Sequence, residues 1–581
     1  MPNKQTLADT LAEIQVHGRR PLLINRTTRA FAWLSLLLGV ATIVASTYIG
    51  ICGYSPVLFG DEWAMPMDTV IFGGHYPLSK LWEQHNEHRI PFQKALELLG
   101  MYWFQADQRF LLVVNWVIQA ALCVAGALFL KRAGGLTFPE WLTAVGLLCF
   151  CAFNPATMQL FVWGIGPTFL GSIAASFISL SALTVSGLRV REGRPAWGWL
   201  VFSLAAALLA ESSLASGVLV WAILPVCAIL LGSRFRVAAG LAAIGALGIG
   251  IYLIGYRTPG NASNPLDAVK NVPQVFAFVD AYFGQTWHDI FPRAGEILAA
   301  IALLVILVFP AIAFLPWKKE RPPLQVFAWS LGTLMVLTSL VTALGRQNEG
   351  ISQAREGRYQ ACAVFFWWAV ALLLLTSARN MGRYRAVGLI AVQALFCLVM
   401  ITNLTAFEDL VQQWSHESYI KNMAGLSVEL GVDDLPMIRH IYPAPPVVIP
   451  LYRGMTAQGL VKPPFPEYRL IGKPLKEVFT VRASGCQGGI QNISVIANRS
   501  LERDITAEGW FEPGPGQPQI RRVFAATDEG WIVGFGVTDQ YQWHLAGTVP
   551  RLAAKLSVYA LLPGGKSICF PPAEKALPKP D

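Results

Sequence analysis

A succession of about eleven apolar stretches constrains the fold of this 581-residue chain more than any other feature. The first covers Phe31–Cys52 and is long enough to cross the ~30 Å hydrocarbon core of a bilayer as a helix. Only 14% of the residues are charged, against about a quarter in soluble proteins. This pattern excludes an ordinary soluble protein and predicts an α-helical polytopic membrane protein. The remaining stretches lie at residues 110–130, 139–155, 166–188, 197–211, 215–232, 237–255, 295–315, 325–343, 360–377 and 386–404.

The basic residues predict how the chain crosses the membrane. Residues 1–30 are polar and arginine-containing, and no small-residue cleavage pattern follows the first apolar stretch, so we expect an uncleaved anchor with a cytoplasmic N-terminus. The later basic clusters then all fall in cytoplasmic loops, as the positive-inside rule requires. Because this sorting accounts for the net charge of +9, we exclude nucleic acid as a partner. The clusters are Lys131–Arg132, Arg189–Arg194, Arg234–Arg236, Lys318–Arg321 and Arg379–Arg385.

This topology places a first external loop, residues 53–109, and everything after about residue 405 outside the cytoplasm. Phe407–Leu430 is expected to lie as a helix along the membrane surface, followed by an extended, proline-rich connector to residue 469. Residues 470–570 predict an extracytoplasmic β-sandwich or jelly-roll-like domain of about seven or eight strands, and residues 571–581 a disordered tail. An oxidising compartment permits a disulfide between Cys486 and Cys569, which spacing alone leaves open. The other cysteines lie in or beside apolar stretches and have no metal-ligand spacing.

Two adjacent carboxylates, Asp61 and Glu62, stand near the start of the longest polar segment of the N-terminal half, Gly60–Leu99. Charge beside a bilayer is costly, so such residues are functional by default, although an extramembrane loop lowers that cost. A carboxylate here could take the proton of an acceptor hydroxyl as that hydroxyl attacks the anomeric carbon of a sugar. The alternative is a pair of solvated loop acids.

The chain resembles the GT-C class of integral-membrane glycosyltransferases. The signature of that class is one or two acidic residues in the first external loop, an interfacial helical loop, many spans and often a soluble external domain. Here Gly60-Asp61-Glu62-Trp63 supplies the acidic motif, and Pro77–Leu99 stands where the interfacial helix is expected. The resemblance implies a GT-C-like transmembrane domain over residues 31–404 that uses a polyprenyl-phosphate sugar as donor and no nucleotide sugar.

A second cluster, His85, Glu87, His88 and Arg89, follows in the same segment. On a helix, His85 and Arg89 would share one face, and so would His85 and His88. These histidines and Arg89 could hold the donor phosphate, whereas a metal site at His85 and His88 is weakly indicated because no further ligands accompany them. The alternative is the wet face of an amphipathic interfacial helix. We therefore treat a divalent metal as open and require no other cofactor.

Arg355 and Arg358 lie between the stretches at 325–343 and 360–377, on the external face, where positive charge is normally scarce. Guanidinium groups bind phosphate through paired hydrogen bonds and stay charged near a membrane, so we expect both to bind the donor phosphate. Anionic lipid headgroups or a salt bridge with Glu356 are the alternatives. Weaker candidates, each also explicable as a structural residue, are Glu87, Glu211, Lys270, His288 and Arg346.

These features predict a membrane glycosyltransferase that moves a sugar from a polyprenyl-phosphate donor to a glycan, lipid or protein acceptor on the extracytoplasmic face. The reaction would be an inverting single displacement in which Asp61, with Glu62, activates the acceptor while the basic residues stabilise the departing lipid phosphate. We expect the protein in the bacterial inner membrane, in contact with the lipid bilayer.

Three other functions remain open at this point. A transporter or flippase for lipid-linked saccharides would have charged or broken helices at mid-membrane depth, whereas the polar clusters here gather at one face. A non-catalytic cell-envelope scaffold would use the β-domain as its working part. A ligase of the O-antigen type would use a diphosphate-linked donor and a large late periplasmic loop.

Overall fold

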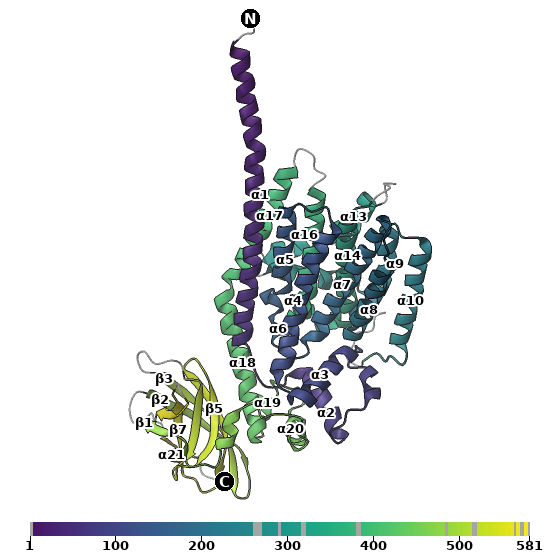
Figure 1. Ribbon diagram of the computed structural model, residues 1–581. Helices are drawn as coiled ribbons and strands as arrows, with labels where there is room; N and C mark the ends of the chain where they lie inside the picture. Colours follow the sequence, from purple (N-terminus) through teal and green to yellow (C-terminus); the bar gives the residue numbers. More distant parts are fainter. Residues whose placement is uncertain are drawn as a thin grey trace.

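The computed structural model describes residues 4–259, 270–288, 292–314, 321–378, 385–482, 486–513, 520–562, 565–569 and 574–578. It consists of a large helical bundle with a smaller β-sheet domain at one end (Figure 1). The first part of helix α1 projects from the opposite end of the bundle. From Lys4 onward the polar N-terminal segment is thus continuous with the first span: α1 runs from Lys4 to Cys52 as one helix, since most residues between Lys4 and Phe31 are good helix formers.

Within the described residues, nine helices are long and apolar enough to cross a membrane. Two shorter apolar helices, α8 (Trp197–Ser213) and α9 (Val220–Leu230), lie at two further predicted spans. Every predicted stretch therefore coincides with an apolar helix, while the number that actually span stays a prediction. The long helices are α1, α4 (Gln108–Ala133), α5 (Phe138–Ala152) with its extensions η3 (Pro155–Thr157) and α6 (Met158–Phe161), α7 (Gly166–Arg191), α10 (Phe235–Leu253), α13 (Pro292–Ala313), α14 (Pro323–Arg346), α16 (Gly357–Ala378) and α17 (Arg385–Thr405).

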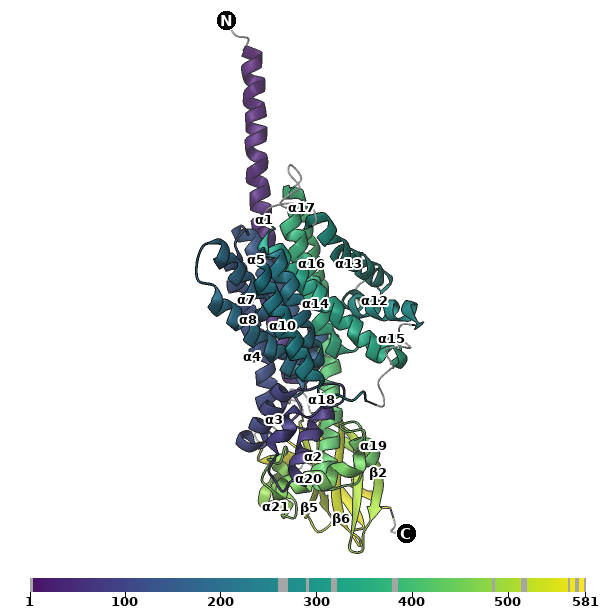
Figure 2. The ribbon, with the colours of Figure 1, turned by 90° about the vertical axis from the view of Figure 1, so that its right-hand side faces the viewer.

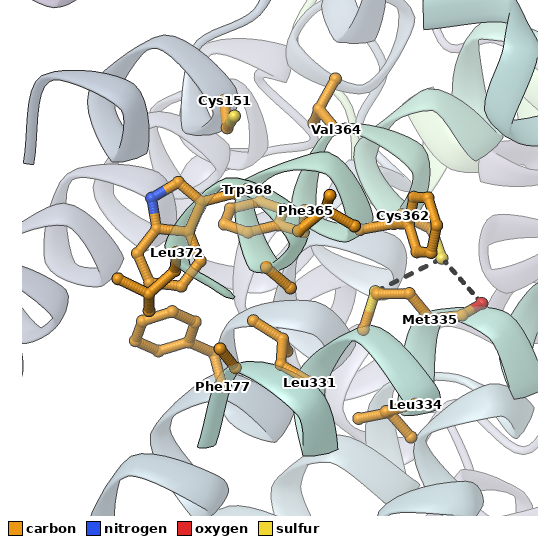
Figure 3. Close-up of a cluster of buried hydrophobic side chains, with 14 of the residues drawn as sticks. Cys151, Phe177, Leu331, Leu334, Met335, Cys362, Val364, Phe365, Trp368 and Leu372 are labelled. Atoms are coloured by element: carbon orange, nitrogen blue, oxygen red, sulfur yellow. Dashed lines mark hydrogen bonds between the residues drawn. The ribbon is translucent and has the colours of Figure 1, made fainter. Parts of the chain in front are cut away.

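Helices α5, α7, α14 and α16 form the centre of the bundle. Their side chains interlock in one buried cluster, in which Phe177 of α7 faces Leu331 of α14 and Trp368 of α16 (Figure 3). Small residues let backbones approach closely: Gly146 of α5 lies against the backbone of Ser35 in α1, where a Cβ would clash with the Ser35 carbonyl oxygen. Helices α10 and α13 stand at the periphery and expose most of their apolar residues, as lipid-facing helices do.

The first external loop folds differently from the predicted single helix over Pro77–Leu99. It contains η1 (Gly60–Trp63), α2 (Ala64–Ile71), η2 (Leu78–Trp82) and α3 (Pro91–Phe104). Between η2 and α3, His85 and His88 exchange backbone hydrogen bonds of 2.7 and 2.9 Å and close a tight hairpin whose turn residue Asn86 has a left-handed φ of 49°. The prediction that His85 and Arg89 share a helix face is therefore wrong, because helix α3 starts only at Pro91, a residue suited to a first helical position.

Shorter helices connect the bundle to its surroundings. Helix α12 (Val272–His288) packs against α13, α14 and α16. Helix α18 (Phe407–Leu430) is expected from the sequence to lie along the membrane surface. In the structure it continues beside α1 toward the sheet, and its second half is buried against β5 and β6 (Figures 1 and 2). The other short elements are η4 (Ala215–Leu219), η5 (Gln347–Glu349) and α15 (Ile351–Ala354).

The proline-rich connector is not extended as predicted, because several of its prolines stand in the first turn of short helices. Val57, Leu58 and Trp63 of the first external loop pack with these helices in a cluster that continues to Phe524 and Phe535 of the sheet. The loop, the connector and the sheet therefore share one core. The connector elements are α19 (Leu435–Ile438), η7 (Pro445–Val447), α20 (Val448–Ala457), η8 (Pro466–Leu470) and α21 (Leu475–Val478).

The C-terminal strands form one sheet rather than the two packed sheets of the predicted sandwich. Their order is β1-β8-β7-β4-β5-β6-β3-β2, with β9 on β7, and all pairs are antiparallel except β1 with β8. A single sheet suffices because one face packs on the connector helices while the other encloses a second apolar cluster. The strands are β1 (Thr480–Arg482), β2 (Cys486–Asn498), β3 (Glu502–Pro513), β4 (Arg522–Thr527), β5 (Ile532–Asp539), β6 (Gln542–Pro550), β7 (Lys555–Leu561), β8 (Ser567–Cys569) and β9 (Glu574–Ala576).

Two details of this domain bear on the predictions. Part of the tail predicted as disordered forms β9, and the neighbouring Leu577 is buried in the apolar cluster of the sheet. Cys569 is disulfide-bonded, while the side chain of Cys486 lies outside the described residues. The seven cysteines in or beside the apolar stretches are free thiols.

Candidate functional site

A cavity of about 360 Å³ lies between the first external loop and the helical bundle. Its polar end is formed by the loop and by the adjoining ends of α14 and α16, and carries Asp61, His85, Glu87, His88, Arg346 and Arg358. Its inner wall consists of residues farther along α7, α14 and α16, such as Ile173, Leu334 and Cys362. Leu334 of this wall lies about 18 Å, by helix rise, from Arg346 on the same helix. The cavity thus joins a charged mouth to an apolar interior.

Figure 3 shows how the inner wall is built. Met335 of α14 lies beside Cys362 of α16, whose thiol contacts the Met335 carbonyl at 3.6 Å and its sulfur at 3.4 Å, and Leu334 lies farther from Cys362 on the same helix as Met335. All three side chains are buried and also line the cavity. The interior of the cavity is therefore backed by the packed core of the bundle, which fixes its shape.

Asp61 faces the cavity from η1. Its side chain is 45% exposed, and its Oδ2 lies 3.9 Å from Nε2 of His85 on the hairpin. The His85 imidazole holds the pKa of Asp61 below its ordinary value against the opposing effect of burial, and the positive charge of Arg358 adds to this. Asp61 is therefore ionised at neutral pH and has an oxygen accessible to a ligand.

Glu62 faces the opposite way, which corrects its prediction as a second catalytic carboxylate. Consecutive residues of a 3₁₀ turn point about 120° apart, so the neighbour of a cavity-facing residue turns into the protein. Glu62 is only 3% exposed, and its carboxylate accepts hydrogen bonds from the backbone N–H of Phe59 at 2.9 Å and from that of Gly164. Burial raises its pKa to about 7. Glu62 ties the loop to the turn before α7 and does not line the cavity.

A buried polar network continues behind Glu62. The Gln93 amide of α3 donates to the Gly164 carbonyl at 2.9 Å and to Oε1 of Glu97 at 2.8 Å. Burial raises the pKa of Glu97 to about 8, and the nearby Glu62 and Asp61 act in the same direction. This network holds the turn containing Trp163, which lines the cavity and donates from its indole to the Phe59 carbonyl at 3.0 Å.

The hairpin brings three of its predicted residues to the cavity. His88 Nε2 lies 3.5 Å from the Glu87 carboxylate, and burial lowers the pKa of His88 to about 4, so its imidazole is neutral at physiological pH. Burial opposes ionisation of Glu87, but His88 and Arg346 outweigh it and hold its pKa below the ordinary value. His85, Glu87 and His88 thus lie together at the mouth, although in a turn rather than on a helix.

The two arginines at the mouth differ in their partners. Arg346 pairs with Glu87 and, at 3.2 Å, with Glu349. Arg358 forms no ion pair with any residue in the described part of the chain, its guanidinium lies 5.3 Å from the Tyr359 ring, and its buried Nε has no hydrogen-bond acceptor. Of the two late arginines predicted to bind the donor phosphate, Arg358 thus lines the cavity, and its binding of a phosphate stays a prediction.

Arg89, Arg355 and Glu211 are not brought to the cavity, contrary to their predicted roles. Arg89 is 5% exposed and donates to the backbone carbonyls of Tyr252 at 2.8 Å, Trp82 at 2.5 Å and Ile254 at 2.6 Å, so its donors are already used within the fold. Arg355 pairs instead with Glu296 at 2.9 Å. Glu211 accepts a hydrogen bond from the Trp221 indole at 2.7 Å.

Two further candidates, Lys270 and His288, do not contribute to the described site. Lys270 precedes α12 and is absent from the lining of the cavity, and the side chain of His288 lies outside the described residues. No group of three or more His, Cys, Asp or Glu residues that could hold a metal ion occurs in the ranges the structure describes. Asp61 and the two histidines thus do not form a metal-binding set, and we derive no chemical step through a metal.

Sequence reasoning missed the hydroxyl-bearing residues of the cavity wall. Thr168, Ser172 and Ser176 line it from α7, and Thr338 and Thr342 line it from α14. Both sets recur every four residues, which places each on one helix face. That spacing inside otherwise apolar stretches was a usable signal for a cavity-facing stripe.

Comparisons with known proteins give few matches. No protein-family model matches the chain, and no curated protein matches it. Among solved structures, the chain is similar to the archaeal oligosaccharyltransferase AglB from Archaeoglobus fulgidus, determined in complex with an inhibitory peptide and a dolichol-phosphate. The identity is 12% and the TM-score 0.35, over 69% of this chain and 58% of that one, so the chain spans less than two thirds of that protein.

Proposed function

We propose that this protein is a membrane glycosyltransferase of the GT-C type, which transfers a sugar from a polyprenyl-phosphate donor to an acceptor hydroxyl at the mouth of the cavity. The acceptor would be a glycan, a lipid or a protein on the extracytoplasmic side, in a bacterial inner membrane. The observation that supports this most is the cavity itself, which combines an accessible carboxylate with an apolar interior between helices and with an arginine that has no ion pair among the described residues. A lipid phosphate has both an anionic headgroup for such a mouth and an apolar chain for such an interior.

The charged mouth suits the chemistry of glycosyl transfer. Asp61, ionised and half-exposed, would accept the proton of the acceptor hydroxyl as its oxygen bonds to the anomeric carbon. The bond from that carbon to the phosphate oxygen breaks, and the electron pair leaves with the polyprenyl phosphate. Attack on the face opposite the leaving group inverts the anomeric configuration.

Arg358 would stabilise the leaving group. Its guanidinium has hydrogen-bond donors to spare, and the negative charge on the phosphate grows as the glycosidic bond breaks. An interaction that strengthens along the reaction lowers the barrier, because it favours the transition state over the bound substrate. His88, neutral at physiological pH, adds a polar contact without adding charge.

The apolar interior would receive the first isoprene units of the donor. Ile173 of α7 and Leu334 and Met335 of α14 form this wall, which ends at the packed core of the bundle. Burial of each methylene contributes about 0.8 kcal/mol, so a polyprenyl chain supplies binding energy that a soluble sugar phosphate lacks.

The test is transfer of labelled sugar from membrane-extracted polyprenyl-phosphate donors by the purified protein. Asp61→Asn keeps the size of the side chain but removes its basicity, so we expect transfer to fall by about three orders of magnitude. The matched control is Asp68→Asn, the same change in the same loop at a carboxylate that pairs with Lys80 at 3.0 Å and does not line the cavity. Full transfer by Asp61→Asn would refute the assignment of the base.

The assay also separates the enzyme from its rivals. A transporter or an assembly scaffold would consume no donor in the wild type. In that case the same lipid would have to be followed across reconstituted vesicles rather than to an acceptor.

A further inference from the structure

The two arginines that line the described cavity differ in whether nearby carboxylates compensate their charge. Arg346, 21% exposed, stands between two carboxylates: Nη2 contacts Glu87 and Nη1 lies 3.2 Å from Glu349. Its charge is compensated within the protein. Arg358 has no such partner among the described residues, and the pKa of Asp61 responds to its charge. Within the part of the chain that the structure describes, the mouth therefore offers one guanidinium without a carboxylate partner.

Glu87 is fixed in its place opposite Arg346. It follows Asn86 in the hairpin closed by His85 and His88, and its backbone carbonyl accepts a hydrogen bond from the Tyr256 hydroxyl at 3.3 Å. The preceding Gln84 is tied through its amide to the backbone of Arg257, with bonds of 2.6 and 2.9 Å. These contacts hold the backbone of the turn, and the ion pair with Arg346 keeps the Glu87 carboxylate at the cavity.

We propose that Glu87 is a specificity-determining residue, which restricts the lipid ligand of this cavity to a single phosphate group and disfavours a diphosphate. This inference rests on the proposed function, because it concerns the headgroup of the same donor. The Arg358 guanidinium binds one phosphate group. A second phosphate would need a second free guanidinium, but Arg346 is occupied by Glu87, and the Glu87 carboxylate would repel the additional negative charge.

The experiment measures headgroup preference in binding and does not depend on transfer. Tritiated farnesyl phosphate is bound to the purified, detergent-solubilised protein, and unlabelled farnesyl phosphate or farnesyl diphosphate competes for it. For the wild type we expect the monophosphate to compete at least about tenfold better. Glu87→Gln frees Nη2 of Arg346, while Nη1 keeps its pair with Glu349, so the diphosphate should gain about tenfold while the monophosphate changes little.

Two further variants keep the result interpretable. Glu83→Gln makes the same change beside the hairpin, at a carboxylate that pairs with Lys80 at 3.4 Å and does not line the cavity, so the preference should stay as in the wild type. If Glu87→Gln does not fold, Glu349→Gln removes the outer partner of Arg346 and should shift the preference in the same direction by less.

The possible outcomes separate this inference from the proposed function. A wild type that prefers the diphosphate, or an unchanged preference in Glu87→Gln, overturns the role of Glu87 while leaving a phosphate site at Arg358. If Arg358→Gln binds both lipids as well as the wild type does, or if the wild type binds neither, the phosphate site itself is misassigned and both proposals fail.

Discussion

The two sides of the first external loop contain the same kinds of charged and polar residues, but these differ in whether their hydrogen-bonding groups have partners within the protein. On the side of the cavity, Asp61 is half-exposed and the buried Nε2 of His85 has no hydrogen-bond partner. On the packed side, the Glu62 carboxylate accepts two backbone N–H groups and the Arg89 guanidinium donates to three carbonyls. The type of a residue therefore does not show whether it can act on a ligand or only stabilises the fold of this loop. The presence of hydrogen-bonding groups without a partner does.

Arg89 and Arg358 show the same difference in hydrogen bonding more clearly. Arg89 and Arg358 both belong to the predicted phosphate-binding set, yet only Arg358 keeps donors free at the cavity. A guanidinium that already serves backbone carbonyls would have to give up those bonds to bind a ligand, and this offsets most of what the ligand offers. We therefore propose that Arg358, and not Arg89, binds an anionic ligand, whereas Arg89 stabilises the fold of the loop.

The largest effect that tests this comparison is the loss of Arg89. Arg89→Ala removes three charged hydrogen bonds and leaves the carbonyls of Trp82, Tyr252 and Ile254 without them, so we expect a loss of about 4 kcal/mol in stability. Thermal unfolding in detergent measures this, and hydrogen exchange should rise first in residues 83–90. The control Arg355→Ala removes an exposed pair with Glu296 and should change stability by less than about 1 kcal/mol.

Donor binding provides the complementary result. Arg89→Ala protein that remains folded should bind farnesyl phosphate nearly as well as the wild type does, because Arg89 does not line the cavity. A large loss of affinity in the folded variant, with little loss of stability, would reverse the assignment of the two arginines.

A smaller effect concerns the pH dependence of the packed side. The pKa of Glu97 is about 8 in the folded protein, against an ordinary value of 4.5, so the folded state retains a proton that the unfolded state releases. Its contribution to stability is complete below pH ~4.5 and is lost as the pH rises through about 8. We expect stability to fall between pH 6 and pH 8, with about 2 kcal/mol of that fall coming from Glu97.

Comparison of the melting temperatures of the wild type and Glu97→Gln at both pH values tests this. The neutral amide can keep the contact with Gln93 but cannot titrate, so the variant should lose less stability over this range. Glu83→Gln, at an exposed position of the same loop, should retain the slope of the wild type. A variant as steep as the wild type would mean that Glu97 is ionised when folded.

The sequence was sufficient for the features that depend on long patterns. Apolar stretches gave the positions of the bundle helices, and the alternation and turn residues after residue 470 gave the existence of strands. Position in the first external loop singled out Asp61, which the structure places at the cavity. These predictions succeed because burial of whole segments dominates the energy of each element.

The features that depend on a single backbone angle or on distant partners could not be predicted. One left-handed residue, Asn86, converts the predicted helix into a hairpin, and helical spacing carries no signal for it. The burial of Glu62 depends on Gly164, about a hundred residues away. Likewise, β9 forms because it can pair with β7, although its own sequence, Glu574–Ala576, has little strand character.

The smallest predicted effect is a change in stability that distinguishes the neighbouring carboxylates Asp61 and Glu62. At pH 6, Glu62 with its pKa of about 7 is mostly protonated, so Glu62→Gln replaces an acid by an amide of similar shape. The amide NH₂ then faces a backbone N–H, either that of Phe59 or that of Gly164, and we expect a loss of about 1 kcal/mol. Asp61→Asn, whose side chain is half-exposed, should leave the melting temperature unchanged while transfer collapses. If instead Glu62→Gln abolished transfer at an unchanged melting temperature, both carboxylates would belong to the chemistry, and the division of the loop into two sides would be wrong.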